Sequence, residues 1–169
     1  MAIEHQPPNG FKLPSHEKLI FLAGPIQGAQ DWQAQAIDLL DTNFHVANPR
    51  HDYGDIVFDE AHKIKQVRWE KHQLVRAAQH GGIIFWFAAQ DQSLKYEEGR
   101  AYAQTTRIEF GRAFGWKDFK PSVNISVGID PHYEGGNDFY IRDTAAELNI
   151  PVRDRLLIVC RDVLRGIHG

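Results

Sequence analysis

Five short apolar runs recur along the chain, separated by stretches in which apolar residues recur every three or four positions. The strongest run is Gly82–Phe87, and the others are Lys18–Ala23, Phe44–Ala47, Val123–Ile129 and Ile150–Val152. Short continuous apolar runs are typical of strands buried on both faces, and the longer spacing is typical of helices. The helical stretches cover residues 31–41, 60–79, 106–116 and 154–165. This alternation predicts an α/β fold, with a doubly wound, mainly parallel sheet of five strands and helices on both faces.

The length of 169 residues indicates one domain. Residues 1–15 contain three prolines and a glycine and predict an irregular lead-in, which leaves residues 16–169 as the single domain. The net charge of −3 disfavours a nucleic-acid polymer as partner, and the single Cys160 cannot form an internal disulfide. No apolar run is long enough to span a bilayer, and the first residues lack the apolar core of a signal peptide. We therefore expect a cytoplasmic protein without a membrane partner.

Ligands of open parallel sheets bind outside the carboxyl ends of the strands, where the strand order reverses. The expected strand ends are residues 24–28, 48–53, 87–90 and 128–132, and the loop that leads into Glu109 belongs beside them. The nine histidines show no metal-binding spacing, and the chain has no G-x-S-x-G motif. We therefore expect neither a metal nor an organic cofactor.

Two of these strand ends carry candidate binding residues. Residues 24–28 could let a ligand approach the backbone or could form a plain turn, since they lack the spacing of a dinucleotide or phosphate loop. Arg50, which follows Asn48 and Pro49, could bind a hydroxyl or carboxylate or be a surface arginine. Asp52 lies in a polar loop, where an acid is usually only solvated.

The helix predicted over residues 60–79 carries a second acid of interest. Its expected apolar stripe consists of Ile64, Val67, the stem of Lys71, Leu74, Val75 and Ala78. Glu70 lies on the border of this stripe, where it could reach into a cleft or pair with a lysine. Trp69 lies towards the opposite side, which suggests a contact with another subunit.

Glu109 lies in the stretch QTTRIEFGRAFGW, at the predicted start of a helix. Thr106 and Glu109 satisfy the S/T-x-x-E capping-box pattern, in which the acid only stabilises the helix start. Two features favour a functional role: Gly111 disfavours a helix, and the preceding loop is long. Both interpretations remain open from the residues alone.

Five fragments in order resemble the nucleoside 2-deoxyribosyltransferases, and most closely their nucleoside 2-deoxyribosyltransferase-like branch. The fragments are Leu22–Pro25, Asn48–Arg50, Trp69–Glu70, Ile83–Phe87 and Thr106–Gly111. The resemblance spans roughly residues 18–116. It implies a flavodoxin-like domain, assembled as a homo-oligomer, that cuts and remakes the N-glycosidic bond of nucleosides.

The resemblance also implies roles for particular residues. Glu109 would be the nucleophile that forms a glycosyl ester, ionised near neutral pH with help from the positive end of its helix. Glu70 would take a second acidic role near the base or the sugar. Gly24, Pro25, Ile26, Asn48, Arg50, Asp52, Phe87 and Thr106 are the remaining substrate-binding candidates.

The expected ligands are a small-molecule nucleoside or nucleotide and a free nucleobase. The chain departs from the family pattern in having no acid between Gly99 and Thr105, and in having Gly81–Gly82 where relatives often have aspartate. One alternative is an N-glycosidase of nucleoside 5′-monophosphates, with Arg50, Arg107 or Ser93 binding the phosphate. The other is a non-catalytic nucleotide-sensing module on the same fold.

Overall fold

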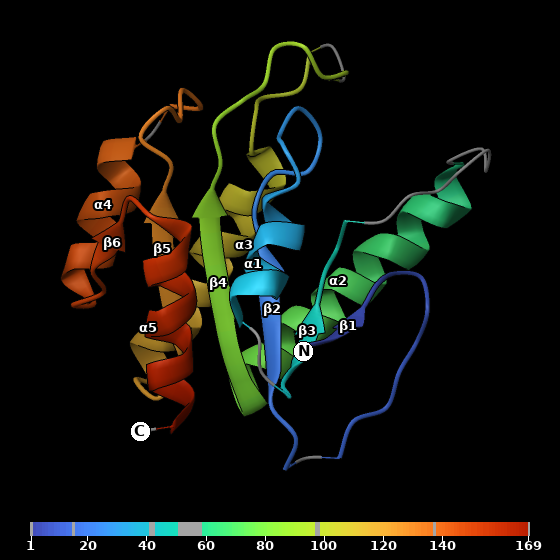
Figure 1. Ribbon diagram of the computed structural model, residues 1–169, viewed down its shortest axis with the longest axis vertical. Helices are drawn as coiled ribbons and strands as arrows, with labels where there is room; N and C mark the ends of the chain where they lie inside the picture. The colour runs from blue at the N-terminus through green and yellow to red at the C-terminus, as the bar shows by residue number, and fades with distance from the viewer. Residues whose placement is uncertain are drawn as a thin grey trace.

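The computed structural model describes residues 2–14, 16–40, 43–50, 59–96, 99–136 and 138–168 (Figure 1). The strands are β1 (Ile3–His5), β2 (Leu19–Ala23), β3 (His45–Ala47), β4 (Gly81–Phe87), β5 (Ile125–Ile129) and β6 (Val152–Arg153). The helices are α1 (Trp32–Leu40), α2 (Glu60–His80), α3 (Gln104–Phe119), α4 (Asp138–Glu147) and α5 (Leu156–His168). No described helix is long and apolar enough to cross a membrane.

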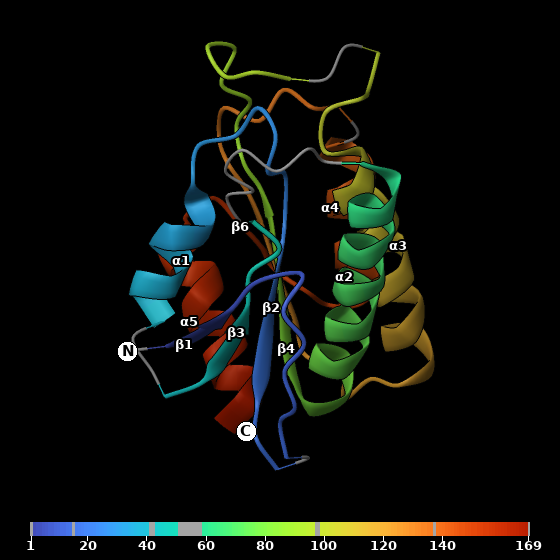
Figure 2. The same cartoon turned by 90° about the vertical axis from the view of Figure 1, so that its right-hand side faces the viewer.

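The strands form one parallel sheet in the order β1-β3-β2-β4-β5-β6. Without β1, this is the flavodoxin-like order, in which the strand order reverses between β2 and β4. Helices α1 and α5 cover one face of the sheet, and α2, α3 and α4 cover the other (Figure 2). The α/β, doubly wound fold is therefore confirmed, with six strands in place of the expected five.

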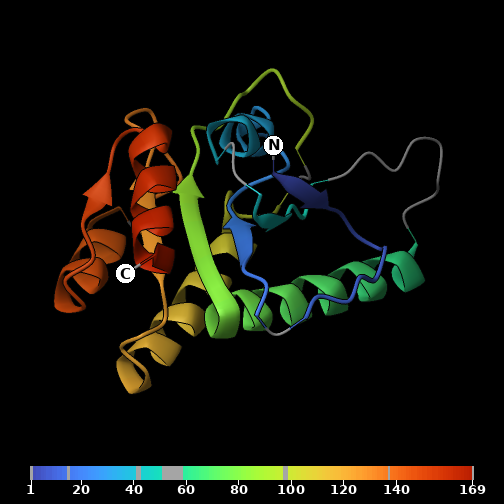
Figure 3. The ribbon, with the colours of Figure 1, turned by 60° about the horizontal axis from the view of Figure 1, so that its bottom comes forward.

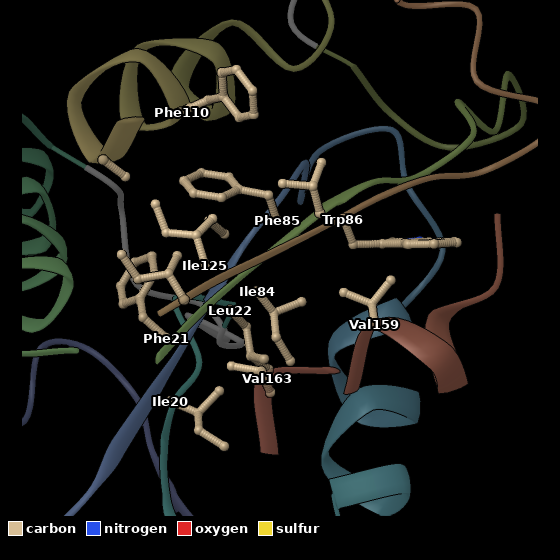
Figure 4. Packing of buried hydrophobic residues seen from close by; sticks show 14 of the residues in the cluster. Ile20, Phe21, Leu22, Ile84, Phe85, Trp86, Phe110, Ile125, Val159 and Val163 are labelled. Carbon is tan, nitrogen blue, oxygen red and sulfur yellow. The ribbon is translucent and has the colours of Figure 1, made fainter. Parts of the chain in front are cut away.

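The core is built on β2 and β4, whose apolar side chains are almost completely buried. Because side chains alternate along a strand, Phe21 and Phe85 point to the face of the sheet that α3 covers with Phe110 (Figure 4). Ile84 points to the opposite face, where α5 contributes Val163 (Figure 4). Burial on both faces explains why these two runs are apolar throughout.

The additional strand comes from the segment expected to be irregular. Residues Ile3–His5 pair with His45–Ala47 and extend the sheet beyond β3. From there the segment continues along α2, where the Trp69 indole N–H donates to the carbonyl of Asn9 at 3.0 Å. Trp69 is therefore only 6% exposed, and its predicted position facing away from the core is wrong.

The core-facing side of α2 also differs from the predicted apolar stripe. The buried residues of α2 are Trp69, Gln73, Leu74 and Ala77. Ile64 and Val67 are 43% and 44% exposed, because α2 packs on the sheet through a side centred between Trp69 and Gln73. The predicted stripe was therefore rotated around the helix, although Leu74 belongs to both sides.

Candidate active site

Glu109 lies in the second turn of α3 and does not cap that helix. The helix begins at Gln104, after Ala103 in the left-handed conformation with φ of 55° and without a side-chain cap. Thr106 therefore lies inside the first turn, where it is buried, and the capping-box interpretation is wrong. Among the described residues, Glu109 has no hydrogen-bond or ion-pair partner, which leaves its carboxyl group available for chemistry.

The charge of Glu70 on α2 affects the pKa of Glu109 on α3. Helices α2 and α3 lie on the same face of the sheet, and both glutamates are half-buried there (Figure 2). Burial, and then the negative charge of Glu70, raise the pKa of Glu109 to about 8, against the opposing effect of Arg112. The two carboxyl groups therefore form one coupled acid pair.

Glu70 has its own hydrogen-bond partner within α2. The Gln66 side-chain N–H₂ donates to Glu70 Oε1 at 2.7 Å. Burial raises the pKa of Glu70, while this hydrogen bond and the charge of Arg100 oppose the increase. Near neutral pH the pair consequently retains a proton that two solvated carboxyl groups would have lost.

The raised pKa of Glu109 differs from the expectation of an ionised nucleophile at a helix start. The favourable effect of the helix dipole falls off within the first turn, and Glu109 lies beyond it. Burial and the second carboxyl group then dominate. In the free protein the pair is thus poised to release a proton as well as to supply a carboxylate.

Two arginines near the pair were not predicted as site residues. Arg112 lies one turn after Glu109, with its guanidinium 4.8 Å from the ring centre of Trp116. Arg100, in the loop before α3, donates from Nη2 to Thr105 Oγ1 at 2.7 Å. The i,i+3 spacing of Glu109 and Arg112 was the available signal for the first, whereas nothing in the spacing indicated the second.

The predicted binding residues at the end of β2 have structural roles. A Cβ atom at Gly24 would lie 2.4 Å from the Trp32 ring and 2.5 Å from the Trp86 carbonyl oxygen, so close packing explains this glycine. The carbonyl of Pro25 accepts a hydrogen bond from the Trp32 indole at 3.0 Å. A contact of Gly24, Pro25 or Ile26 with a ligand stays a prediction.

Arg50 and Asn48 together hold the loop between β2 and α1. Arg50 donates to Gln33 Oε1 at 2.9 Å and to the carbonyl oxygens of Ile26, Ala29 and Gln30 at 3.0–3.1 Å. The Asn48 side chain accepts from the Arg50 backbone N–H at 2.9 Å and donates to Glu4 at 2.7 Å. These contacts are at the start of α1, whereas Glu70 and Glu109 belong to helices on the other face.

Phe87 is fully buried, with its ring 5.8 Å from that of Phe110 and 5.6 Å from that of Tyr133. The Phe87 ring packs against α3 through Phe110, and Thr106 is also buried. Asp52 lies outside the described residues. Of the predicted site residues that the structure describes, Glu70 and Glu109 are the two acids whose charges interact.

The loops at the carboxyl ends of the strands are joined to one another. The Asp91 N–H donates to the Gly28 carbonyl at 2.8 Å, which links the loop after β4 to the loop after β2. Arg107 donates to the carbonyl oxygens of Tyr102 and Gly135 and so links the start of α3 to the loop after β5. These links fix the backbone that leads into α3.

The hollows lined by described residues include two with volumes of about 240 and 670 Å³. The larger lies beside α1 and is lined in part by Asn48, Arg50 and Asp31, and the smaller lies near Lys117 and Asp162. Glu109 lines neither. The acid pair is therefore a separate feature of the α2–α3 layer.

A family model described as "Nucleoside 2-deoxyribosyltransferase like" matches residues 17–113, which is more than half of the chain. The matched region contains Glu70 and Glu109, together with the strands on both sides of the point where the strand order reverses. No curated protein matches the chain.

Proposed function

The chain belongs to the nucleoside 2-deoxyribosyltransferase-like family, and on this premise we propose that it cleaves the N-glycosidic bond of a (deoxy)nucleoside and transfers the sugar to a second nucleobase. Glu109 is the nucleophile and Glu70 is the acid coupled to it. The observation that supports this assignment is that two half-buried carboxyl groups lie on neighbouring helices of one face of the sheet (Figure 2), with the charge of Glu70 contributing to the raised pKa of Glu109. A carboxylate next to a protonated carboxyl group is the arrangement that glycosyl transfer with retention requires.

In the first half of the reaction, the proton held by the two carboxyl groups neutralises the departing base. The bond between C1′ and the base nitrogen breaks, and the electron pair of this bond stays on the base. A Glu109 oxygen forms an ester bond to C1′, and the proton held by the pair moves to the base. The charge of Glu70 favours a protonated Glu109 in the resting pair, so the reactive form is the one in which the proton lies on Glu70 and Glu109 is ionised. The step leaves the uncharged glycosyl ester, the protonated base and an ionised Glu70.

The second half reverses these steps with another nucleobase. The incoming base attacks C1′, the ester bond to Glu109 breaks, and the proton of the attacking nitrogen returns to the pair. Two displacements at C1′ give net retention of configuration. Water in place of the base would produce hydrolysis. No step uses a metal or an organic cofactor.

The hydrogen bonds of the residues that could bind a 5′-phosphate do not favour a nucleoside 5′-monophosphate as the substrate. Arg50 and Arg107 both donate to backbone carbonyl oxygens, and Ser93 Oγ donates to Asp91 at 2.5 Å. These donors hold loops, so a phosphate would have to displace internal hydrogen bonds. A nucleoside is therefore the substrate class we propose.

Deoxyadenosine supplied with free cytosine tests the proposal, with both nucleosides and both bases followed by chromatography. We expect transfer by the natural chain and a loss of at least about 10³-fold in Glu109→Gln. Glu147→Gln, an exposed position on α4, is the matched control and should retain full activity. Binding of nucleosides without any base release, even at high protein concentration, would support a nucleotide-sensing module instead.

A further inference from the structure

The N-terminal segment, residues 2–14, lies outside the region that the family model matches and folds back over helix α2. It begins as β1 at the edge of the sheet and then runs along α2 before the chain enters β2 (Figure 3). The Trp69 indole N–H donates to the Asn9 carbonyl at 3.0 Å, and Arg76 donates to the Pro14 carbonyl at 2.9 Å. The segment is therefore a strap over α2, and we call it the N-terminal strap.

Strand β1 gives the N-terminal strap a short attachment to the sheet. It has three residues and lies at the sheet edge beside β3. The Ile3 N–H donates to the Phe44 carbonyl, and the Asn48 N–H donates to the His5 carbonyl, each at 2.9 Å. Ile3 is 47% exposed, so its burial adds little. Because the first residues of a domain are poorly ordered unless they are tied down, side-chain contacts should decide whether β1 stays attached.

Two histidines tie the N-terminal strap to the sheet and to the chain that leads into β2. His5 Nε2 on β1 lies 2.7 Å from His45 Nδ1 on β3. His45 Nε2 in turn lies 2.8 Å from Glu17 Oε2. The His5 ring is stacked on Phe11, with ring centres 3.6 Å apart, and the Phe11 ring centre is 6.4 Å from that of Trp69. One cluster thus joins β1, β3 and the part of the strap that covers α2.

Glu17 fixes the direction of each hydrogen bond in this cluster. A carboxylate only accepts, so a neutral His45 donates from Nε2 and accepts at Nδ1, and His5 donates from Nε2. One added proton can be accommodated, because His45 keeps the Glu17 counter-charge and His5 can then accept through Nε2. A second proton cannot, because both facing nitrogens would carry hydrogen and both rings would be positive.

The charges around the two rings oppose the second protonation. Burial, and then the charge of His45, lower the pKa of His5, while Glu4 on β1 opposes this effect. Glu17 faces His45, and α2 contributes the uncharged ring of Trp69. A detached β1 would leave His5 with its ordinary pKa of 6.5. The attachment is therefore fully stabilised above pH 6.5 and weakens as the pH falls below it, because the detached form then binds the additional proton.

We propose that the N-terminal strap is a proton-operated switch, in which protonation of both His5 and His45 detaches β1 from β3 and uncovers Trp69 on α2. Trp69 directly precedes Glu70, so the switch acts on the helix that carries one acid of the candidate pair. The inference rests on the contacts of the strap and is independent of the proposed reaction.

Hydrogen exchange of the Ile3 and Asn48 backbone N–H groups tests the switch, measured by NMR and corrected for the intrinsic exchange rate at each pH. We expect their protection to fall about fivefold between pH 6.5 and pH 5.5. His5→Gln keeps a donor to His45 and cannot be protonated, so its protection should stay constant. His16→Gln, at an exposed histidine close to the cluster in sequence, is the matched control and should behave like the natural chain. Constant protection in the natural chain, or an equal loss in His5→Gln, overturns the proposal.

Two further measurements keep the test independent of one variant. In chains that carry 5-fluorotryptophan, the fluorine NMR signal of Trp69, identified by its absence from Trp69→Phe, should move over the same pH range. Glu17→Gln should make the loss of protection steeper, because His45 then lacks the counter-charge that lets the attached strap hold one proton. Circular dichroism establishes that each variant is folded. Loss of protection at Ile3 without a change at Trp69, or a shallower loss in Glu17→Gln, would contradict the proposed switch.

Discussion

Glu70 on α2 and Glu109 on α3 are half-buried carboxyl groups whose charges interact, and this coupling contributes to the pKa of about 8 at Glu109. Neither residue is tied to its own helix end, and Glu109 has no hydrogen-bond partner among the described residues. A relationship of this kind is unfavourable for stability. Both residues lie within the family match, which is consistent with a functional role.

The free energy of unfolding should depend on pH because the pKa of Glu109 is raised in the folded protein. A carboxyl group with a pKa of about 8 when folded, against 4.5 as its ordinary value, stabilises the fold most below pH 4.5 and loses that contribution as the pH rises to 8. Glu109→Gln should therefore be more stable than the natural chain at pH 8, by about 1–3 kcal/mol after allowance for solvent screening. Urea unfolding at pH 4 and pH 8 measures the difference, which should vanish at pH 4.

Removal of the charge of Glu70 should lower the pKa of Glu109. Burial remains in Glu70→Gln, so the pKa should fall below 8 and still exceed the ordinary value of 4.5. Carbon-13 NMR titration of the glutamate carboxyl groups reports this shift directly. The exposed Glu147→Gln variant should leave the titration unchanged, and an identical pKa in Glu70→Gln would show that the two groups are not coupled.

The close packing around Gly24 should require a glycine at this position, whether or not a ligand also contacts it. Gly24→Ala places a Cβ atom against the Trp32 ring and the Trp86 carbonyl, and we expect a loss of about 1–3 kcal/mol in the free energy of unfolding. Gly10→Ala is the control, since a Cβ atom there meets nothing within 4 Å. Equal stability of the two variants would show that the site at Gly24 relaxes freely.

Arg50→Lys separates the charge of this residue from its geometry. Lysine keeps the positive charge but cannot donate to Gln33 and to three carbonyl groups at once, so the loop before α1 should loosen. We expect the free energy of unfolding, measured by thermal unfolding, to fall by about 1–3 kcal/mol. The exposed Arg161→Lys on α5 should change nothing. A change in substrate affinity at unaltered stability would instead assign Arg50 to binding.

The parts of the fold that the sequence predicted are those with a strong local pattern. Strands β2 and β4 are apolar throughout because they are buried on both faces, and such runs are recognisable without a structure. Strand β1 was missed because three residues at a sheet edge depend on pairing with β3. Helix α4 was missed because exposed Phe139 and Tyr140 interrupt its polar side.

The candidate site was predictable only in part, for a related reason. Glu109 stood out through its motif, but the effect of the Glu70 charge on it depends on α2 and α3 lying on the same face of the sheet (Figure 2). Ile64 and Val67 misled the assignment of the buried side of α2, because they are apolar residues on its exposed side. The structural use of Arg50 was likewise not predictable, since its acceptors are carbonyl groups far along the chain.

The central claim is that a Glu109 oxygen forms a temporary ester with C1′ of the sugar. Its most direct measurement is mass spectrometry of the protein, quenched in acid after incubation with deoxyadenosine without an acceptor base and then digested. We predict one added deoxyribosyl group, located on the peptide that contains Glu109 and absent from Glu109→Gln. Base release by the natural chain with the added group on another residue, or with undiminished release by Glu109→Gln, would contradict the account.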